Sequence, residues 1–232
     1  MTFRDWLYSI LNLFYPRVCA ACGEPLLKDE YTVCLKCRYT LPRTGYEHHP
    51  DNPVAQSFYG RVPLHAATSC YFFAKSGKVQ HLIHQLKYKG NKEAGVFLGQ
   101  QIGESIKDKP LFQGIDYIIP VPLHPKREKQ RGYNQSLMIA LGIHETAGID
   151  VTEKYLVRTV YTATQTHKTA EERFKNVKDI FEVRFAKELE GKHVLLVDDV
   201  LTTGATLESC ALALENIPGI RISVATATCA GN

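Results

Sequence analysis

One stretch of the chain decides its fold class: residues 193–206 read HVLLVDDVLTTGAT. The unbroken apolar run over 193–197 predicts a buried strand, and the apolar residues over 207–214 repeat at the spacing of a helix. Two adjacent carboxylates, Asp198 and Asp199, stand between them and are followed by a loop rich in hydroxyl groups. A buried strand that leads through a short loop into a helix is the unit from which parallel α/β sheets are built.

The loop after the two carboxylates has the chemistry of a phosphate site. Backbone N–H groups at a helix N-terminus have no partner within the helix and point outward at the positive end of the helix dipole. Gly204 lets the backbone approach a phosphate closely. The two carboxylates can accept hydrogen bonds from sugar hydroxyls one step away. A ribose 5-phosphate satisfies both halves, and the predicted ligand-binding residues are Asp198, Asp199, Thr202, Thr203, Gly204, Ala205 and Thr206.

The alternative is an ordinary helix start, in which Thr202 or Thr203 caps the helix behind an acidic pair on the surface. Because strand, acids and hydroxyl loop are contiguous, the ligand site is the favoured interpretation. The two glycine-rich nucleotide motifs that would compete with it, Gly-x-x-x-x-Gly-Lys and Gly-x-Gly-x-x-Gly, are absent from the sequence.

Strand and helix patterns alternate from about residue 62 to the C-terminus. The predicted strands are 67–74, 116–121, 181–183, 193–197 and 221–227, and the predicted helices are 78–88, a segment through 96–102, 136–144 and 207–214. Buried strands separated by helices predict an α/β fold, a parallel twisted sheet flanked by helices on both faces. Ligands of such folds lie beyond the carboxyl ends of the strands.

Four cysteines near the N-terminus form two Cys-x-x-Cys pairs, Cys19 with Cys22 and Cys34 with Cys37. Two such pairs are the usual ligand set of a tetrahedral Zn²⁺ ion, and four thiolates leave no open position, so the site is expected to be structural. The alternatives are two disulfides or a redox pair. The other cysteines, Cys70, Cys210 and Cys229, are expected to be small buried apolar residues.

The chain divides into three blocks on these patterns. Residues 1–45 hold an amphipathic helix, with Trp6 and Leu7 on its apolar side, and the four-cysteine module; 46–62 read as a turn-rich connector; 63–232 form the α/β domain. Hydrophobic residues make up 44% and charged residues 22% of the 232 residues, which is typical of a globular protein. With no secretory signal or transmembrane-length segment, the expected setting is the reducing cytoplasm.

The net charge of +4 is mild, but its distribution is uneven. Basic residues gather between 75 and 92 and again between 126 and 131. They indicate either a solvated face or a phosphate-rich ligand, single-stranded nucleic acid included.

Taken together, these motifs resemble the ComF family, amidophosphoribosyltransferase-like competence proteins with a type I phosphoribosyltransferase fold. The resemblance rests on 197–206, on the cysteine pairs, and on further segments along nearly the whole chain: Leu86-Lys87-Tyr88, Pro120-Val121-Pro122-Leu123-His124, Arg131-Gly132-Tyr133-Asn134-Gln135, and Gln165 with Arg173 and Asn176.

The resemblance implies that the ligand is phosphoribosyl pyrophosphate bound with Mg²⁺. Asp198 and Asp199 would hold the ribose hydroxyls and 202–206 the 5-phosphate, while 120–126 would face the pyrophosphate and 158–176 would form a mobile lid. Arg173 in that lid joins the two carboxylates as a candidate catalytic residue. Family members commonly carry a second basic residue where this chain has Val160, so the lid supplies less charge here.

The basic stretches fit this implication, because a departing pyrophosphate needs fixed cations as well as Mg²⁺. The candidates on that side are Lys87, His124, Lys126, Arg127 and Arg131. His124 has a second interpretation, as a structural turn residue. The segment 131–135 also has two: Asn134 caps a helix after Gly132, or Arg131 and Tyr133 line the site and stack on a base.

Two functions compete on this reading. One is an enzyme that transfers a phosphoribosyl group, with Mg²⁺, to an unidentified acceptor. The other is a non-catalytic component of natural transformation that binds a phosphorylated ribose or single-stranded DNA and contacts other competence proteins. The sequence shows no acceptor pocket that would decide between them.

Overall fold

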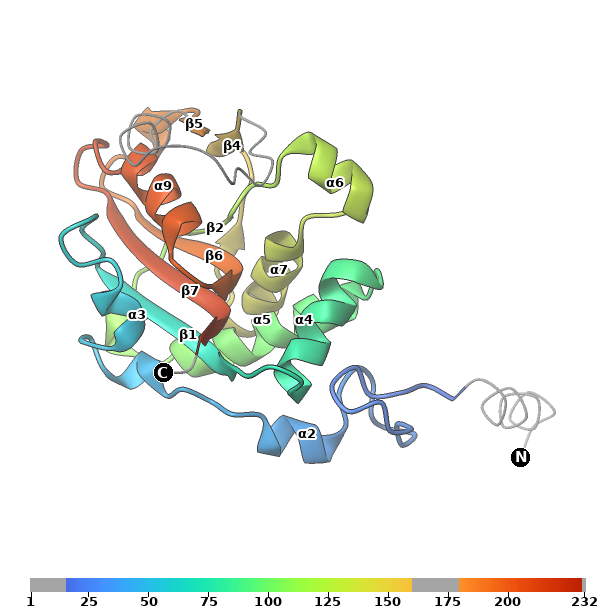
Figure 1. Cartoon of the computed structure of the whole chain (residues 1–232). Helices are drawn as coiled ribbons and strands as arrows, with labels where there is room; N and C mark the ends of the chain where they lie inside the picture. Colours follow the sequence, from blue (N-terminus) through green and yellow to red (C-terminus); the bar gives the residue numbers. More distant parts are fainter. Residues whose placement is uncertain (1–15, 160–179, 231–232) are drawn as a thin grey trace.

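The computed structural model describes residues 16–159 and 180–230, and its centre is a five-stranded, fully parallel sheet (Figure 1). The strands lie in the order β1-β7-β6-β2-β3. Their bounds are β1 Ala66–Phe73, β2 Tyr117–Pro120, β3 Asp150–Val151, β6 His193–Leu201 and β7 Arg221–Ala230. The predicted parallel α/β architecture is therefore confirmed.

Helices cover both faces of this sheet (Figure 1). One face carries α4 (Lys78–Tyr88), α5 (Lys92–Ile106) and α7 (Gln135–Ala147), and the other carries α3 (Pro53–Gln56) and α9 (Ala205–Leu214). Helices α5 and α7 pack closely because glycines face each other: a Cβ atom on Gly99 would clash with the carbonyl oxygen of Ile139, and one on Gly142 with that of Val96. The 3.6-residue periodicity predicted α4 at its observed bounds.

Strand β6 is longer than the sequence predicts. Its apolar run ends at Val197, yet the pairing with β7 continues through Asp198 opposite Thr226 to Leu201 opposite Cys229. Asp198 and Asp199 therefore belong to the strand itself, and the pairing with β7 fixes the backbone that carries their side chains. An acidic pair after an apolar run looks like the start of a loop, and only the neighbouring strand shows otherwise.

A second, two-stranded sheet lies apart from the first. Strands β4 (Leu156–Arg158) and β5 (Phe181–Val183) pair antiparallel, with Arg158 opposite Phe181. The expected lid, 158–176, begins at the end of β4, and its residues from 160 onward, Val160 and Arg173 included, lie outside the described part of the chain. The amphipathic helix expected before residue 16 lies outside it as well.

The N-terminal segments pack onto the sheet domain. The short helices are α2 (Leu35–Thr40), η1 (Tyr46–His48), η2 (Pro110–Phe112) and η3 (Ala186–Leu189), and α6 spans Pro125–Arg131. The segment expected as a connector contributes to the core, because Phe58 is 1% exposed and the buried Asn52 donates a hydrogen bond to the carbonyl of Ala67. Among the described residues, no helix has both the length and the apolar character to cross a bilayer.

Candidate functional site

The carboxylates of Asp198 and Asp199 lie in the second half of β6, where Asp199 is buried and Asp198 is partly buried. One oxygen of Asp198 accepts hydrogen bonds from the Ser136 hydroxyl at 3.0 Å and from the Asp199 backbone N–H at 2.8 Å. Ser136 is placed there because Asn134 caps the first turn of α7. The strand and the helix start together fix the orientation of the first carboxylate.

Lys87 binds the second carboxylate. Its ammonium nitrogen lies 2.9 Å from an oxygen of Asp199, and both side chains are mostly buried. The lysine comes from the C-terminal end of α4, which packs over this edge of the sheet. Lys87 was expected on the pyrophosphate side, and the structure places its charge on the acid pair itself.

This arrangement changes the protonation of Asp198. Burial, and next the negative charge of Asp199, raise the pKa of Asp198 to about 7, against the opposing hydrogen bonds from the Asp199 backbone and Ser136. At neutral pH the pair therefore exists with Asp198 partly protonated, and a ligand that offers hydroxyl donors or a cation favours its charged form.

The loop after β6 leads into α9 with its polar groups exposed. Thr202, Thr203, Ala205 and Thr206 face solvent, and Gly204 is the N-cap residue with a φ of 77°. Neither threonine is the N-cap, contrary to the capping alternative; the Thr203 hydroxyl accepts only one long hydrogen bond, 3.4 Å, from the Ala205 N–H. The hydroxyls and N–H groups at this helix start are arranged as an anion site requires.

Arg61 stabilises this loop from behind and was not predicted. Its guanidinium donates to the carbonyl of Thr203 at 3.3 Å, forms an ion pair with Glu208 at 2.6 Å, and lies over the Phe58 ring. A Cβ atom on Gly204 would lie 3.2 Å from that ring. Residues 61 and 203 meet only in the folded chain, so no local sequence signal could have revealed the contact.

Two of the other basic candidates, Arg127 and Arg131, line a neighbouring cavity of about 540 Å³ between α4 and α6. Its lining includes Lys87, Arg127 and Arg131. Lys126 is exposed on the same helix. His124 is the N-cap of α6 and accepts a hydrogen bond from the Lys126 N–H at 3.2 Å. It therefore has a structural role at this turn, in line with its second interpretation. Burial and the nearby cations lower the pKa of His124.

The segment 131–135 has the capping role predicted for Gly132 and Asn134, whereas Tyr133 does not have the stacking role. Asn134 caps α7, and Gly132 ends α6 with a left-handed φ of 80°. Tyr133 is buried, and its hydroxyl donates a hydrogen bond to the Leu86 carbonyl, so it does not present a stacking face. Arg131 instead lies over the ring of Tyr88, 5.9 Å from its centroid.

The four cysteines of the N-terminal module converge on one point. The sulfurs of Cys19, Cys22, Cys34 and Cys37 all lie within 4.8 Å of one another, and the pair Cys22 and Cys34 is 3.9 Å apart. Tetrahedral coordination with Zn–S bonds of 2.3 Å requires sulfurs about 3.8 Å apart. The geometry fits a metal such as zinc and is consistent with a zinc module.

The thiols of this cluster are not equivalent. Burial opposes ionisation of Cys19, but the backbone N–H groups of Cys34, Cys22 and Ala21 lower its pKa to about 7. Burial and the neighbouring thiols raise the pKa of Cys37. All seven cysteines of the chain are free thiols, and Cys70, Cys210 and Cys229 are buried as expected.

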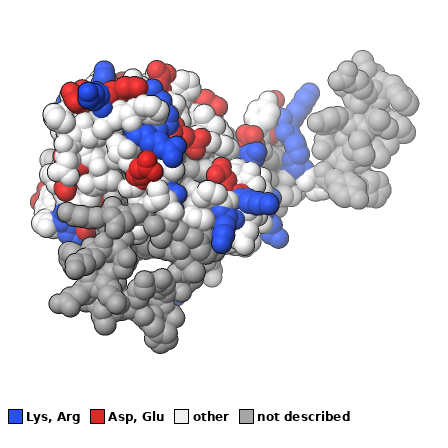
Figure 2. All heavy atoms as spheres, turned by 90° about the horizontal axis from the view of Figure 1, so that it is seen from above, with Lys and Arg blue, Asp and Glu red and all other residues white. Residues whose placement is uncertain are grey.

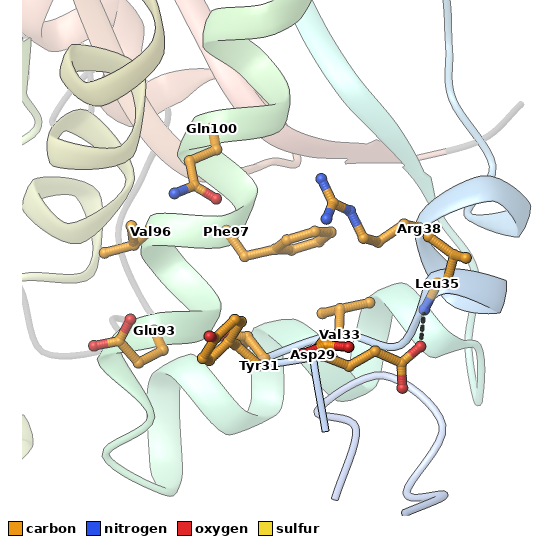
Figure 3. A pocket seen from close by; sticks show the side chains of 11 residues that line it. Asp29, Tyr31, Val33, Leu35, Arg38, Glu93, Val96, Phe97 and Gln100 are labelled. Atoms are coloured by element: carbon orange, nitrogen blue, oxygen red, sulfur yellow. Dashed lines mark hydrogen bonds between the residues drawn. The ribbon is translucent and has the colours of Figure 1, made fainter. Parts of the chain in front are cut away.

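A second hollow of about 300 Å³ lies between the cysteine module and α5 (Figure 3). Phe97 forms part of its wall, and the exposed Tyr31 stands at its edge. Three carboxylates, Asp29, Glu30 and Glu93, and one cation, Arg38, line it. Glu30 accepts hydrogen bonds from the Leu27 and Leu35 N–H groups. This acidic cleft is chemically unlike the basic cavity beside Asp199.

Comparison with protein families places residues 145–230 in the family described as phosphoribosyl transferase domain. The matched region contains β6, the loop after it, the whole of α9, and β7. Asp198, Asp199 and the loop 202–206 therefore lie within the family match, whereas Lys87 and the four cysteines lie outside it.

Two curated relatives match the chain over most of its length. DNA utilization protein YhgH of Salmonella typhi is 29% identical over 216 residues, covering 88% of this chain and 93% of the relative. Competence protein ComFC of Bacillus subtilis is 31% identical over 215 residues, covering 91% and 84%. Among solved structures, the glutamine phosphoribosylpyrophosphate amidotransferase of B. subtilis is 20% identical, with a TM-score of 0.41 over 59% of this chain and 26% of that one.

Proposed function

The chain belongs to the ComF family of proteins with a type I phosphoribosyltransferase fold, and on that premise we propose that it binds phosphoribosyl pyrophosphate, or a related phosphorylated ribose, at the β6–α9 loop. One observation carries the proposal: the two carboxylates of β6 lie next to an exposed threonine-rich loop, and the left-handed Gly204 at the end of that loop is the N-cap of α9. This pairs acceptors for sugar hydroxyls with donors for a phosphate.

The residues divide the ligand between them. The N–H groups and hydroxyls of 202–206 hold the 5-phosphate, and Arg61 keeps the loop in place through the Thr203 carbonyl. Asp198 and Asp199 accept hydrogen bonds from the ribose hydroxyls. The Lys87 ammonium nitrogen lies 2.9 Å from an Asp199 oxygen. An arriving ribose must therefore share this carboxylate with the ammonium group or displace it.

Mg²⁺ would be held at the carboxylate oxygens, donors of the kind this ion prefers, and when bound it neutralises charge on the pyrophosphate. In the enzyme form of the proposal, the bond from the anomeric carbon to the pyrophosphate oxygen breaks and a bond to the acceptor forms. Lys87, Arg127 and Arg131 then stabilise the departing anion as fixed cations. The lid residues, Arg173 among them, are proposed to exclude water.

The cysteine module is proposed to hold a structural Zn²⁺ ion through Cys19, Cys22, Cys34 and Cys37. Free thiols at all seven cysteines support a reducing, cytoplasmic setting.

Isothermal titration with ribose 5-phosphate and with phosphoribosyl pyrophosphate plus Mg²⁺ tests the proposal. The wild-type protein is expected to bind both, and the double variant Asp198→Asn with Asp199→Asn to bind neither while remaining folded. Unchanged binding by that variant would remove the assignment. Pyrophosphate release from the same sample distinguishes an enzyme from a binding protein.

A second candidate function, a single-stranded DNA-binding component of DNA uptake that contacts other competence proteins, is favoured by the exposed Tyr88 beside the basic cavity. Bases stack on exposed aromatic rings while basic groups contact the phosphates. Filter binding of a short oligonucleotide over a range of salt concentrations tests this function. Affinity should fall steeply with salt, and a flat response would contradict it.

A further inference from the structure

Helix α9 carries an anionic side chain of its own close to the proposed phosphate site. Glu208 is the acidic residue of its first turn, and the Glu208 backbone N–H donates to the Gly204 carbonyl at 2.8 Å. A carboxylate in a first turn is attracted by the same helix dipole and the same N–H groups that attract a phosphate. Without a partner, Glu208 would therefore repel the 5-phosphate or compete with it for these donors.

The Arg61 guanidinium holds this carboxylate in place. One of its terminal nitrogens lies 2.6 Å from a Glu208 oxygen, and the other donates to the carbonyls of Ser57 and, at 3.3 Å, of Thr203. The guanidinium also lies over the Phe58 ring, 5.6 Å from its centroid. Because these contacts use both ends of the planar fork, they fix its orientation. A single guanidinium group therefore separates the Glu208 carboxylate from the loop.

The ion pair is partly sheltered from solvent. The Glu208 side chain is 17% exposed and the Arg61 side chain 35%, so the solvent screens this carboxylate less than one on the open surface. In the view from above, basic and acidic side chains are intermingled over the visible face and form no continuous basic stripe (Figure 2). The charge of Glu208 is thus balanced locally by Arg61 and not by a broad positive field.

From these contacts we infer that Arg61 is a positioning residue of the phosphate site: it neutralises Glu208 and keeps this carboxylate away from the N–H groups at the start of α9. The inference rests on the proposed function, because it concerns the phosphate half of that site. It adds a charge effect to the support that Arg61 gives the loop through the Thr203 carbonyl. The two effects differ in what they predict when Glu208 is replaced as well.

The test is a double-mutant cycle on Arg61 and Glu208, measured as the dissociation constant of ribose 5-phosphate by isothermal titration. Arg61→Met leaves Glu208 without its cation and should weaken binding about fivefold. Glu208→Gln removes the carboxylate and should strengthen binding about twofold. The double variant should return to within about twofold of the wild type. Arg61→Lys keeps the charge without the fork and should bind more tightly than Arg61→Met.

Salt provides a readout that a purely structural role would not change. The Debye length falls from about 10 Å at 0.1 M to about 3 Å at 1 M salt, so the difference between Arg61→Met and the double variant should fall below about twofold. Lys192→Met is the matched control, because it removes the cation of the 3.0 Å ion pair with Asp116 at the opposite end of β6. Its affinity should equal that of the wild type at both salt concentrations. Thermal unfolding of each variant separates loss of folding from loss of binding.

The outcomes divide clearly. Rescue of Arg61→Met by Glu208→Gln supports the inference. If the double variant binds as weakly as Arg61→Met, the arginine acts through the loop carbonyls alone and the inference is overturned. Should Arg61→Met fail to fold, Glu208→Gln decides: tighter binding that disappears at 1 M salt supports the charge effect, and unchanged affinity contradicts it. Failure of the wild type to bind ribose 5-phosphate overturns the proposed function itself.

Discussion

Two clusters in this molecule bring ionisable side chains of the same kind close together, where their negative forms would repel one another. The two clusters differ in the groups that surround these side chains. Lys87 forms an ion pair with Asp199, and the Ser136 hydroxyl donates a hydrogen bond to the neighbouring Asp198. The four thiols of the cysteine module lie within 4.8 Å of one another, and the described contacts to them are backbone N–H groups and other thiols. The acid pair has a cation and a hydroxyl donor beside it and is open to a ligand, whereas the four thiols face one another in the closed arrangement that suits a structural metal ion.

The comparison teaches where the free energy of folding comes from in each region. A metal bound by four thiolates contributes to folding, because the site exists only in the folded chain. A largely buried carboxyl whose pKa is raised opposes folding whenever it is ionised. We therefore expect substitutions in the cysteine cluster to destabilise the protein, and substitutions in the acid pair to remove function while leaving stability intact or improved.

The largest effect is expected for Cys37→Ser. A three-ligand site binds zinc more weakly, and the melting temperature should fall by about 5 to 10 °C for a loss of 2 to 3 kcal/mol. Elemental analysis and thermal unfolding check this prediction. Cys229→Ala, which removes a buried thiol outside the cluster, should keep its metal. Full metal content and unchanged stability in Cys37→Ser would show that the two clusters do not differ as described.

Asp198→Asn should weaken ligand binding without lowering the stability of the protein. Ligand affinity should fall about a hundredfold or more, since the site loses a charge-assisted acceptor. The pKa of Asp198 is raised to about 7, so its contribution to stability is lost as pH rises from about 4 through 7. The variant should accordingly melt above the wild type at pH 8 and close to it at pH 5. A lower melting temperature at pH 8 would contradict the raised pKa.

Much of this contrast could be predicted from the sequence, because both clusters are local in the chain. The Cys-x-x-Cys pairs predict a metal site by their spacing alone, and the periodicity of Val79, Leu82, Ile83 and Leu86 gives α4 at its observed bounds. The loop after β6 follows from an apolar run that leads into acids, hydroxyls and a glycine. Each of these signals lies within about twenty residues.

What could not be predicted depends on contacts between distant segments. Arg61 reaches the Thr203 carbonyl across 142 positions of sequence, and Lys87 reaches Asp199 from another helix. Burial of Tyr133 could not be told from stacking on a ligand, because an aromatic ring suits both. The extension of β6 through Leu201 required the partner strand β7 to be known.

Ligand binding should also depend on pH in a way that isolates the acid pair. With a pKa of about 7, Asp198 is about a tenth ionised at pH 6 and nine-tenths at pH 8, so affinity for ribose 5-phosphate should rise about ninefold between them. The ligand's own phosphate also titrates near pH 6. In Asp198→Asn only the titration of the ligand's phosphate can change the affinity, so this variant measures that contribution by itself. Identical pH profiles for the wild type and the variant would show that Asp198 plays no part.

The smallest effect is expected for Gly204→Ala, which tests the loop rather than the acids. The residue has a φ of 77°, and a Cβ atom would meet the Phe58 ring at 3.2 Å. The strain should cost about 1 to 2 kcal/mol and lower the affinity for ribose 5-phosphate several-fold. Combining it with Phe58→Leu relieves the contact but not the backbone strain, so recovery should be partial. Full wild-type affinity in Gly204→Ala would show that the loop backbone does not hold the phosphate.

The most direct test of the central claim is a two-dimensional NMR titration of the isotope-labelled protein with ribose 5-phosphate. The account predicts that the backbone amide resonances of Gly204, Ala205 and Thr206 shift together as the phosphate binds, while those of Cys19, Cys22, Cys34 and Cys37 stay in place. If the resonances of the β6–α9 loop remain unmoved while others shift, the phosphorylated ribose binds elsewhere and the claim is wrong.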